Sequence, residues 1–137
     1  MDLRKKYGTD KQLETDGIDL HLGEDAYITV ARAGGANARY ETEMRRAHKA
    51  NKRAVQMETL DNREAEKILK GVLARTVVLG WRGIVLDGKP LDFSQDNCLL
   101  LFEELPEVYR VVLDESQKLA NFRAEEISDE GNASAPT

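Results

Sequence analysis

Apolar and polar residues alternate with different periods along the chain, and each period predicts a different element. Apolar residues alternate with polar ones from Ile18 to Leu22, and a second β-rich run covers residues 27–30. A short loop containing Gly23 separates the two runs, so residues 17–33 are expected to form a β-hairpin. The exposed edges of this hairpin would need cover from the rest of the chain or from a partner.

The strongest helical pattern lies in residues 61–79. Asp61 and Glu64 have the spacing of a capping box, and apolar residues then recur every three or four positions. Gly80 lies where such a helix would end. The apolar face of this helix is expected to organise the core. The predicted core residues are Leu69, Val72, Leu73, Val77, Trp81, Phe93, Val112 and Phe122.

Three other segments have helical patterns. Residues 38–53 are highly charged with few apolar positions, which predicts a solvated helix. Ser94 caps a predicted helix over residues 94–104. Pro106 ends that helix and begins another over residues 106–122. The Asp87-Gly88 pair between the central helix and Ser94 predicts a tight turn.

These elements predict an α+β fold that is mainly helical. The hairpin is expected to lie beside a bundle of about four helices in one domain covering residues 17–123. Residues 1–16 are polar and are expected to form a loosely held arm. Residues 124–137 have the composition of a disordered acidic tail.

Charge is distributed unevenly over the 137 residues, whose net charge is −5. Residues 39–53 contain six Lys or Arg and two Glu, whereas residues 84–137 contain twelve acids and four bases. Such polarity can steer a partner or orient self-association. No apolar run has the length of a signal peptide core or a membrane span, so we expect a cytoplasmic protein.

The residues give little support for catalysis. His21 and His48 have no Cys, Asp or second His at metal-ligand spacing. The loop at residues 33–36 lacks the Lys and Ser/Thr of a phosphate-binding loop. Cys98, the only cysteine, lies on an apolar helix face with acidic neighbours, which favours a buried hydrophobe over a nucleophile. We therefore expect no enzyme activity, no metal and no cofactor.

Two features have alternative interpretations. Trp81 is either a core residue, which we favour, or an exposed anchor for a partner. The basic helix, through residues such as Arg45 and Arg46, would contact either nucleic acid or an acidic protein surface. The acidic total and the near absence of aromatic residues in this helix favour a protein partner.

A series of short motifs follows in a characteristic order: VVLGWRGI, then LDGKPLDFSQDN, then the Pro-started LPEVYRVVLDES. This order resembles that of the small tail assembly chaperones of long-tailed bacteriophages and prophages, over about residues 17–123. The positions that carry the resemblance are Trp81, Gly83, Ile84, Asp87, Gly88, Phe93, Ser94, Asn97 and Pro106.

The resemblance implies a non-enzymatic role in the cytoplasm of the infected host. Such chaperones coat the tape measure protein, help to recruit tail tube subunits and leave before the virion matures. Many are made in two lengths by a ribosomal frameshift. The alternatives are a structural virion protein, such as a tail completion or head–tail joining subunit, and a nucleic-acid-binding regulator that acts through residues 39–53.

The residues expected to contact such partners lie in three places. They are Tyr27 and Val30 near the hairpin edge, Arg45 and Arg46 in the basic helix, and Leu100, Phe102, Tyr109 and Leu113 in the last two helices. The apolar members of this set could equally be core residues, and for Phe102 the core is the favoured interpretation.

Overall fold

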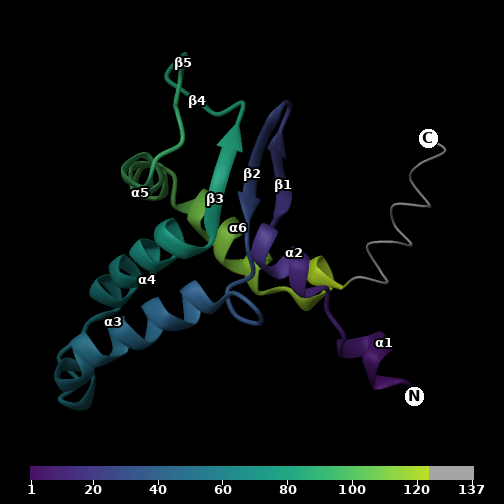
Figure 1. Ribbon diagram of the computed structural model, residues 1–137. Coiled ribbons are helices and arrows are strands. Elements are labelled where there is room, and N and C mark those ends of the chain that lie inside the picture. The colour runs from purple at the N-terminus through teal and green to yellow at the C-terminus, as the bar shows by residue number, and fades with distance from the viewer. Residues whose placement is uncertain (124–137) are drawn as a thin grey trace.

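The computed structural model describes residues 1–123; the acidic tail expected at residues 124–137 lies outside the described residues. Three antiparallel strands form the main sheet, in the order β1 (Ile18–Gly23), β2 (Ala26–Val30) and β3 (Val78–Arg82). The predicted hairpin at residues 17–33 is confirmed, with Leu20 opposite Ile28. The fold is α+β and mainly helical, as expected (Figure 1).

The third strand corrects the prediction of a helix through residue 79. Helix α4 (Asn62–Thr76) ends earlier, and Val77 forms its C-cap. Residues 78–82 leave the helix and pair with β2, with Trp81 opposite Ile28. Consecutive β-branched residues at 76–78 favour extended backbone. Pairing also covers the edge of β2 that the hairpin alone would expose.

A second, two-stranded sheet extends from the end of β3. It joins β4 (Val85–Leu86) to β5 (Lys89–Pro90) through the Asp87-Gly88 turn predicted from the sequence. Both turn residues have positive φ, 52° and 76°, which is the conformation a tight hairpin turn requires. The indole Nε1 of Trp81 donates a hydrogen bond to the carbonyl of Leu91, 2.7 Å away, and so anchors the chain that returns from this hairpin.

Four longer helices complete the fold. Helix α3 (Ala38–Gln56) runs three residues beyond the predicted end and turns back into α4. Helices α5 (Gln95–Glu104) and α6 (Pro106–Gln117) meet at Leu105, with Pro106 in the first turn of α6 as predicted. The predicted last helix over residues 106–122 ends at Gln117, and a 3-10 turn, η1 (Leu119–Phe122), follows it.

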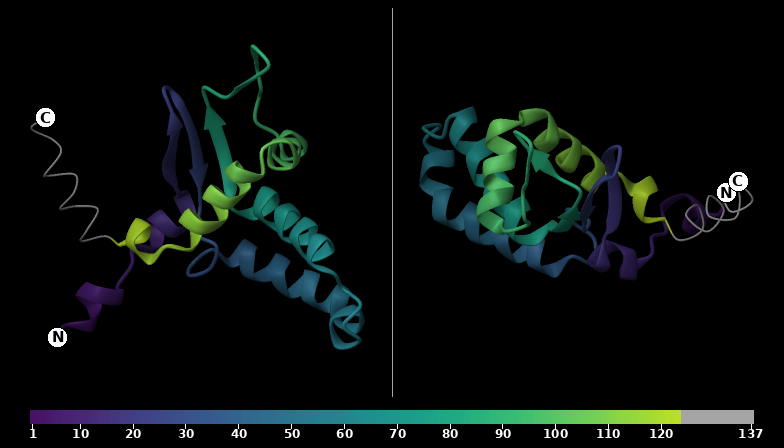
Figure 2. Two further views of the ribbon diagram at one scale, coloured as in Figure 1. Left: turned by 180° about the vertical axis from the view of Figure 1, so that it is seen from behind. Right: turned by 90° about the horizontal axis from the view of Figure 1, so that it is seen from above.

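The core lies between one face of the main sheet and the helices α4, α5 and α6. Leu20, Ile28 and Val30 from the sheet belong to one cluster with Leu73 and Phe102 from the helices. Helix α6 crosses this face of the sheet, which is visible when the molecule is seen from behind (Figure 2, left). Seen from above, α3 and α4 lie at one end of the molecule and the N-terminal helices at the other (Figure 2, right).

The predicted core is largely confirmed. Five predicted core residues are fully buried: Val72, Leu73, Val77, Val112 and Phe122. Leu69 and Trp81 are partly buried and pack against the core from its edge. The prediction for Phe93 is wrong, because its side chain is 36% exposed. It lies edge-on to Trp81, with ring centroids 5.0 Å apart, at the base of the β4–β5 hairpin.

The N-terminal segment differs from the loose arm expected over residues 1–16. Helix α1 (Leu3–Tyr7) buries no residue, but α2 (Lys11–Asp16) is held against the body. The Glu14 carboxylate is buried and pairs with the guanidinium of Arg32. The amide of Asp10 donates a hydrogen bond to the carbonyl of Phe122, at 2.7 Å. Tertiary contacts across long sequence separations, which local composition does not reveal, hold this segment in place.

Candidate functional site

Helices α3 and α4 form a helical hairpin that extends away from the sheet (Figure 1). Helix α3 buries none of its 19 residues completely, because its packing is almost entirely against α4. Asn37 begins this helix, and its side-chain oxygen accepts a hydrogen bond from the amide of Tyr40. A helix that packs on only one neighbour leaves part of its apolar stripe uncovered.

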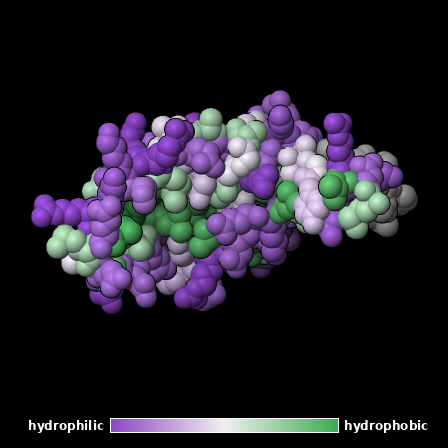
Figure 3. All heavy atoms as spheres, turned by 90° about the horizontal axis from the view of Figure 1, so that it is seen from below, coloured by the Kyte–Doolittle hydropathy of each residue, from purple (hydrophilic) through white to green (hydrophobic). Residues whose placement is uncertain are grey.

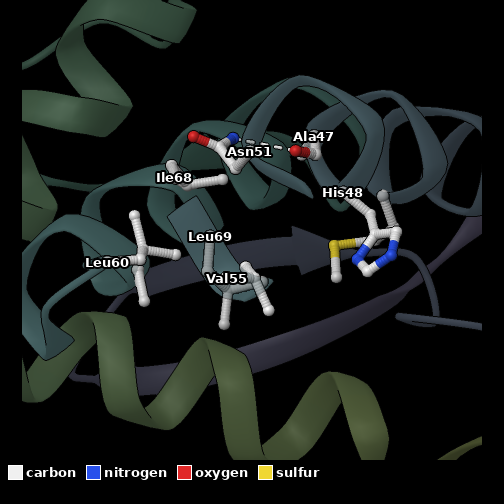
Figure 4. A pocket seen from close by; sticks show the side chains of 9 residues that line it. Ala47, His48, Asn51, Val55, Leu60, Ile68 and Leu69 are labelled. Atoms are coloured by element: carbon white, nitrogen blue, oxygen red, sulfur yellow. Dashed lines mark hydrogen bonds between the residues drawn. The ribbon is translucent and has the colours of Figure 1, made fainter. Parts of the chain in front are cut away.

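An apolar groove runs between the two helices on one side of this hairpin. Its volume is about 240 Å³, and it is open to solvent along its length. The residues that line it are Met44, Ala47, His48, Asn51 and Val55 from α3, Leu60 from the connecting loop, and Ala65, Ile68 and Leu69 from α4. Figure 4 shows these side chains around the groove. We refer to them together as the α3–α4 groove.

The polar atoms of the α3–α4 groove are few. The Asn51 Nδ2 donates to the carbonyl of Ala47 one turn earlier, at 2.8 Å (Figure 4). His48 is exposed at the margin. The groove is too open and too poor in converging polar groups for a typical small-molecule site. An extended apolar groove between helices is instead suited to another helix.

The groove continues into exposed apolar surface at the end of the hairpin. Val55 is 46% exposed, and Met57 in the connecting loop is 61% exposed. Seen from below, apolar side chains form a band at the α3–α4 end of the molecule, with hydrophilic side chains on both sides of it (Figure 3). Contiguous exposed apolar surface bordered by charge is typical of protein–protein interaction sites.

The two flanks of α3 differ in their electrostatics. On one flank, Glu43 contacts both Arg46 and the Arg75 guanidinium of α4, at 3.1 and 3.5 Å. Arg39 on the same flank donates to the Arg75 carbonyl, at 2.7 Å. These contacts close that side of the hairpin. The α3–α4 groove therefore opens on the other flank.

A row of cations follows that open flank. Arg45, Lys49 and Lys52 are spaced four and three residues apart, which places them on one side of the helix next to the groove-lining stripe. All three are exposed, and within residues 1–123 none of them forms an ion pair. The groove therefore has an uncompensated positive margin.

Some of the residues expected to bind a partner are buried in the core, and the others are at least partly exposed. Val30, Phe102 and Tyr109 are buried, so for them the core interpretation is correct. Arg45 borders the groove, whereas Arg46 pairs with Glu43 on the opposite flank. Arg45 and Arg46 were predicted to contact the same partner, but they lie on different sides of α3.

The remaining partner candidates lie away from the groove. Tyr27 is half-buried on the outer face of the sheet, where it stacks on His21 and lies under the guanidinium of Arg82. Leu113 is half-buried against the core. Leu100 is 44% exposed on α5, beside Leu105 and the β4–β5 hairpin. These residues do not form one surface with the α3–α4 groove.

Sequence reasoning missed most of the groove. The helix predicted over residues 38–53 ends before Val55, so its few apolar positions do not show a continuous stripe. With the helix extended to Gln56, the spacing of residues 44, 47, 48, 51 and 55 is a regular helical stripe. A longer helical window would have revealed this signal.

Within residues 1–123, the cysteine and the two histidines considered as catalytic candidates lie in separate places. Burial raises the pKa of the Cys98 thiol to about 12, so it stays protonated at neutral pH. The His21 ring lies 2.7 Å from the carbonyl of Glu24, on a hairpin far along the chain from His48. Among residues 1–123, no three His, Cys, Asp or Glu side chains are grouped so that they could hold a metal ion. The described helices also include none suited to spanning a membrane.

A polar network of three side chains lies on the outer face of the sheet. The Asp19 carboxylate accepts a hydrogen bond from the Thr29 hydroxyl, at 2.7 Å, and pairs with Arg82, at 3.1 Å. The Thr29 hydrogen bond and the nearby guanidinium lower the pKa of Asp19. This network links all three strands and therefore has a structural explanation.

One comparison with known proteins gives a match. The family model described as YdaY prophage protein matches residues 35–132, which is most of the chain and includes both helices of the α3–α4 groove. No curated protein and no solved structure matches the chain.

Proposed function

This chain belongs to the YdaY prophage protein family, and we propose that it is a tail assembly chaperone of a prophage. Its role is to bind the tape measure protein in the host cytoplasm while tail tube subunits assemble. The protein acts through a binding surface and has no catalytic role, no metal and no cofactor.

The observation that carries this proposal is the α3–α4 groove. A tape measure protein is a long helical chain whose apolar stripes lie exposed until the tube encloses them. Such stripes need an apolar surface that is already solvated and accessible in the free chaperone. The α3–α4 hairpin provides this surface on an arm that extends away from the core.

Two further observations support the assignment. The family match associates the chain with prophages. The ordered motifs around Trp81, the Asp87-Gly88 turn and Pro106 resemble those of tail assembly chaperones. In the structure these motifs build the β3 end, the β4–β5 hairpin and the α5–α6 junction, which form the body that supports the groove.

The test of this function uses a lysogen in which the prophage encodes a tagged copy of the chain. After induction, we expect the tape measure protein of the same prophage to co-purify with the tagged chain from the lysate. We also expect mass spectrometry to find the chain absent from purified, finished particles. A chain present in particles in a fixed ratio to the tube protein would identify a structural virion protein instead.

A further inference from the structure

We infer that the α3–α4 groove binds one amphipathic helix whose apolar stripe is flanked by carboxylates, and that Arg45, Lys49 and Lys52 select those carboxylates. This inference rests on the proposed function and deepens it, because it specifies which segments of a partner chain the protein would hold.

The shape of the groove sets the size of its occupant. The lining residues of α3 extend from Met44 to Val55, a rise of roughly 16 Å along the helix axis. That length accommodates about three turns of a second helix lying along the hairpin. A partner helix would present apolar residues at positions i, i+3 or i+4, and i+7 to fill it.

The chemistry of the lining excludes several other kinds of occupant. Aliphatic side chains and Met44 form most of the surface; the lining includes no Phe, Tyr or Trp, and its one ring is the imidazole of His48 at the exposed margin. Single-stranded nucleic acid would be expected to stack its bases on aromatic side chains. A duplex would be expected to contact cationic and polar side chains through its phosphates, and it would leave the apolar floor of the groove unused. The groove therefore fits a protein helix better than a nucleic acid.

The cations beside the groove determine the charge of that helix. Arg45, Lys49 and Lys52 follow the open flank for two turns without carboxylate partners among residues 1–123. A helix docked in the groove would bring its own flanking residues to this row. Carboxylates on the partner helix would favour binding beside this row of cations, and Lys or Arg at the same positions would weaken it.

Within residues 1–123, the exposed surfaces of a second copy do not offer such a helix. Helix α6 is acidic near its start, but its apolar stripe, including Tyr109 and Val112, is already buried in its own core. The exposed Leu100 and Leu105 border the β4–β5 hairpin and do not form a stripe of three turns. Residues 1–123 of a second copy therefore do not supply the occupant, and we assign it to a different chain.

The experiment measures binding of two synthetic helical peptides to the full-length protein by fluorescence anisotropy. Both peptides carry leucines at i, i+3 and i+7; one has glutamates at the flanking positions and the other has lysines. We expect the glutamate peptide to bind about 10-fold more tightly at low salt, and the difference to shrink as salt rises. Equal affinity for the two peptides would overturn the selection by charge.

Matched variants locate the site. Arg45→Glu with Lys52→Glu reverses two cations on the open flank. Arg46→Glu with Arg53→Glu makes the same change of charge at the same seven-residue spacing, on the side of α3 that carries the Arg46–Glu43 pair. We expect the first pair to weaken binding of the glutamate peptide about 10-fold and the second pair to change it less than about 2-fold. Equal weakening by both pairs would overturn the assignment to this flank.

A variant of the groove floor tests the apolar contact. Val55→Asp changes a side chain that is already 46% exposed, so the protein is expected to fold. It should abolish measurable peptide binding. Binding unchanged in Val55→Asp would overturn the groove as the site, and so would displacement of the peptide by a DNA duplex. A stable dimer that excludes the peptide would show that a second copy is the occupant.

Different results would contradict the proposed function and the inference about the groove. Co-purification of the tape measure protein without binding of the glutamate peptide would overturn the groove inference and leave the proposed function standing. Peptide binding with the predicted variant pattern, but without co-purification of the tape measure protein, would support the groove and contradict the role in tail assembly.

Discussion

Glu14 is a carboxylate with only 2% of its surface exposed, on a helix that has no apolar face. Its charge is compensated by the guanidinium of Arg32 and by the Thr9 hydroxyl, which donates a hydrogen bond at 3.1 Å. The amide of Arg32 also donates to the Glu14 carbonyl, at 2.9 Å. One side chain thus joins the N-terminal segment to the loop that leads into α3.

We expect Glu14→Gln to lower the free energy of unfolding by about 2 kcal/mol, because it leaves the largely buried Arg32 guanidinium without its counter-charge. Urea denaturation followed by circular dichroism measures this change. Glu104→Gln, at an exposed position without an ion pair, is the matched control and should change the value by less than about 0.5 kcal/mol. Equal midpoints for the two variants would contradict the account of residues 9–17.

Cys98 is fully buried, and its thiol pKa is raised to about 12 by that burial. Only the thiolate reacts with disulfide reagents, so a group with this pKa is almost wholly protonated at pH 8. We expect the native protein to react with an aromatic disulfide reagent far more slowly than the urea-unfolded protein, measured by absorbance. Equal rates in the two states would show that Cys98 is accessible and contradict its place in the core.

At the scale of elements, α3 depends on one polar side chain for its direction. Asn37 is 5% exposed, and its Nδ2 donates to the carbonyls of Arg32 and Thr76, each at 2.9 Å. The first carbonyl lies before α3 and the second at the end of α4. Asn37 therefore caps the helix and also fixes the base of the groove-bearing hairpin.

We expect Asn37→Ala to lower the free energy of unfolding by about 2 kcal/mol, because it removes the helix cap and the side-chain donor to one buried and one partly buried carbonyl. Asn51→Ala removes the same side chain from the middle of the same helix. It should cost less than about 0.5 kcal/mol, because Asn51 only donates back to its own helix. A cost for Asn51→Ala as large as that for Asn37→Ala would contradict this role for Asn37.

The sequence predicts correctly those helix ends and turns that are determined by residues close by in the chain. The Asp61 cap, the Asp87-Gly88 turn and the start of α6 at Pro106 are set by neighbouring residues, and the structure confirms all three. Strand β3 depends on pairing with β2, about fifty residues earlier in the chain. The apolar periodicity of the preceding helix extends past residue 76, so it predicts a helix through residue 79 where the structure has a strand. Tertiary contacts overrode local pattern there.

The candidate site was less predictable than the fold, for the same reason. The stripe on α3 could be read from spacing, but whether it faces the core or solvent depends on where α4 and the sheet lie. Phe102 and Leu100 illustrate the point. They are two residues apart on α5, yet one is fully buried and the other is 44% exposed.

At the scale of the whole molecule, structural support and binding surface lie in different regions. The sheet, α5 and α6 share one apolar core, and the α3–α4 hairpin extends from it with an exposed groove (Figure 1). Charge is uneven in the same sense, because α3 in the arm is basic whereas residues 84–123 contain eight acids and four bases. The proposed chaperone role requires a stable body and an accessible arm, and this arrangement provides both.

The most direct test of the account is the soluble fraction of the tape measure protein from the same prophage, measured after co-expression with this chain. We expect the wild-type chain to keep most of the tape measure protein in the supernatant, and the Val55→Asp variant to leave it in the pellet. Arg46→Glu with Arg53→Glu should behave as the wild type does. A tape measure protein that is equally insoluble with and without the wild-type chain would contradict the central claim.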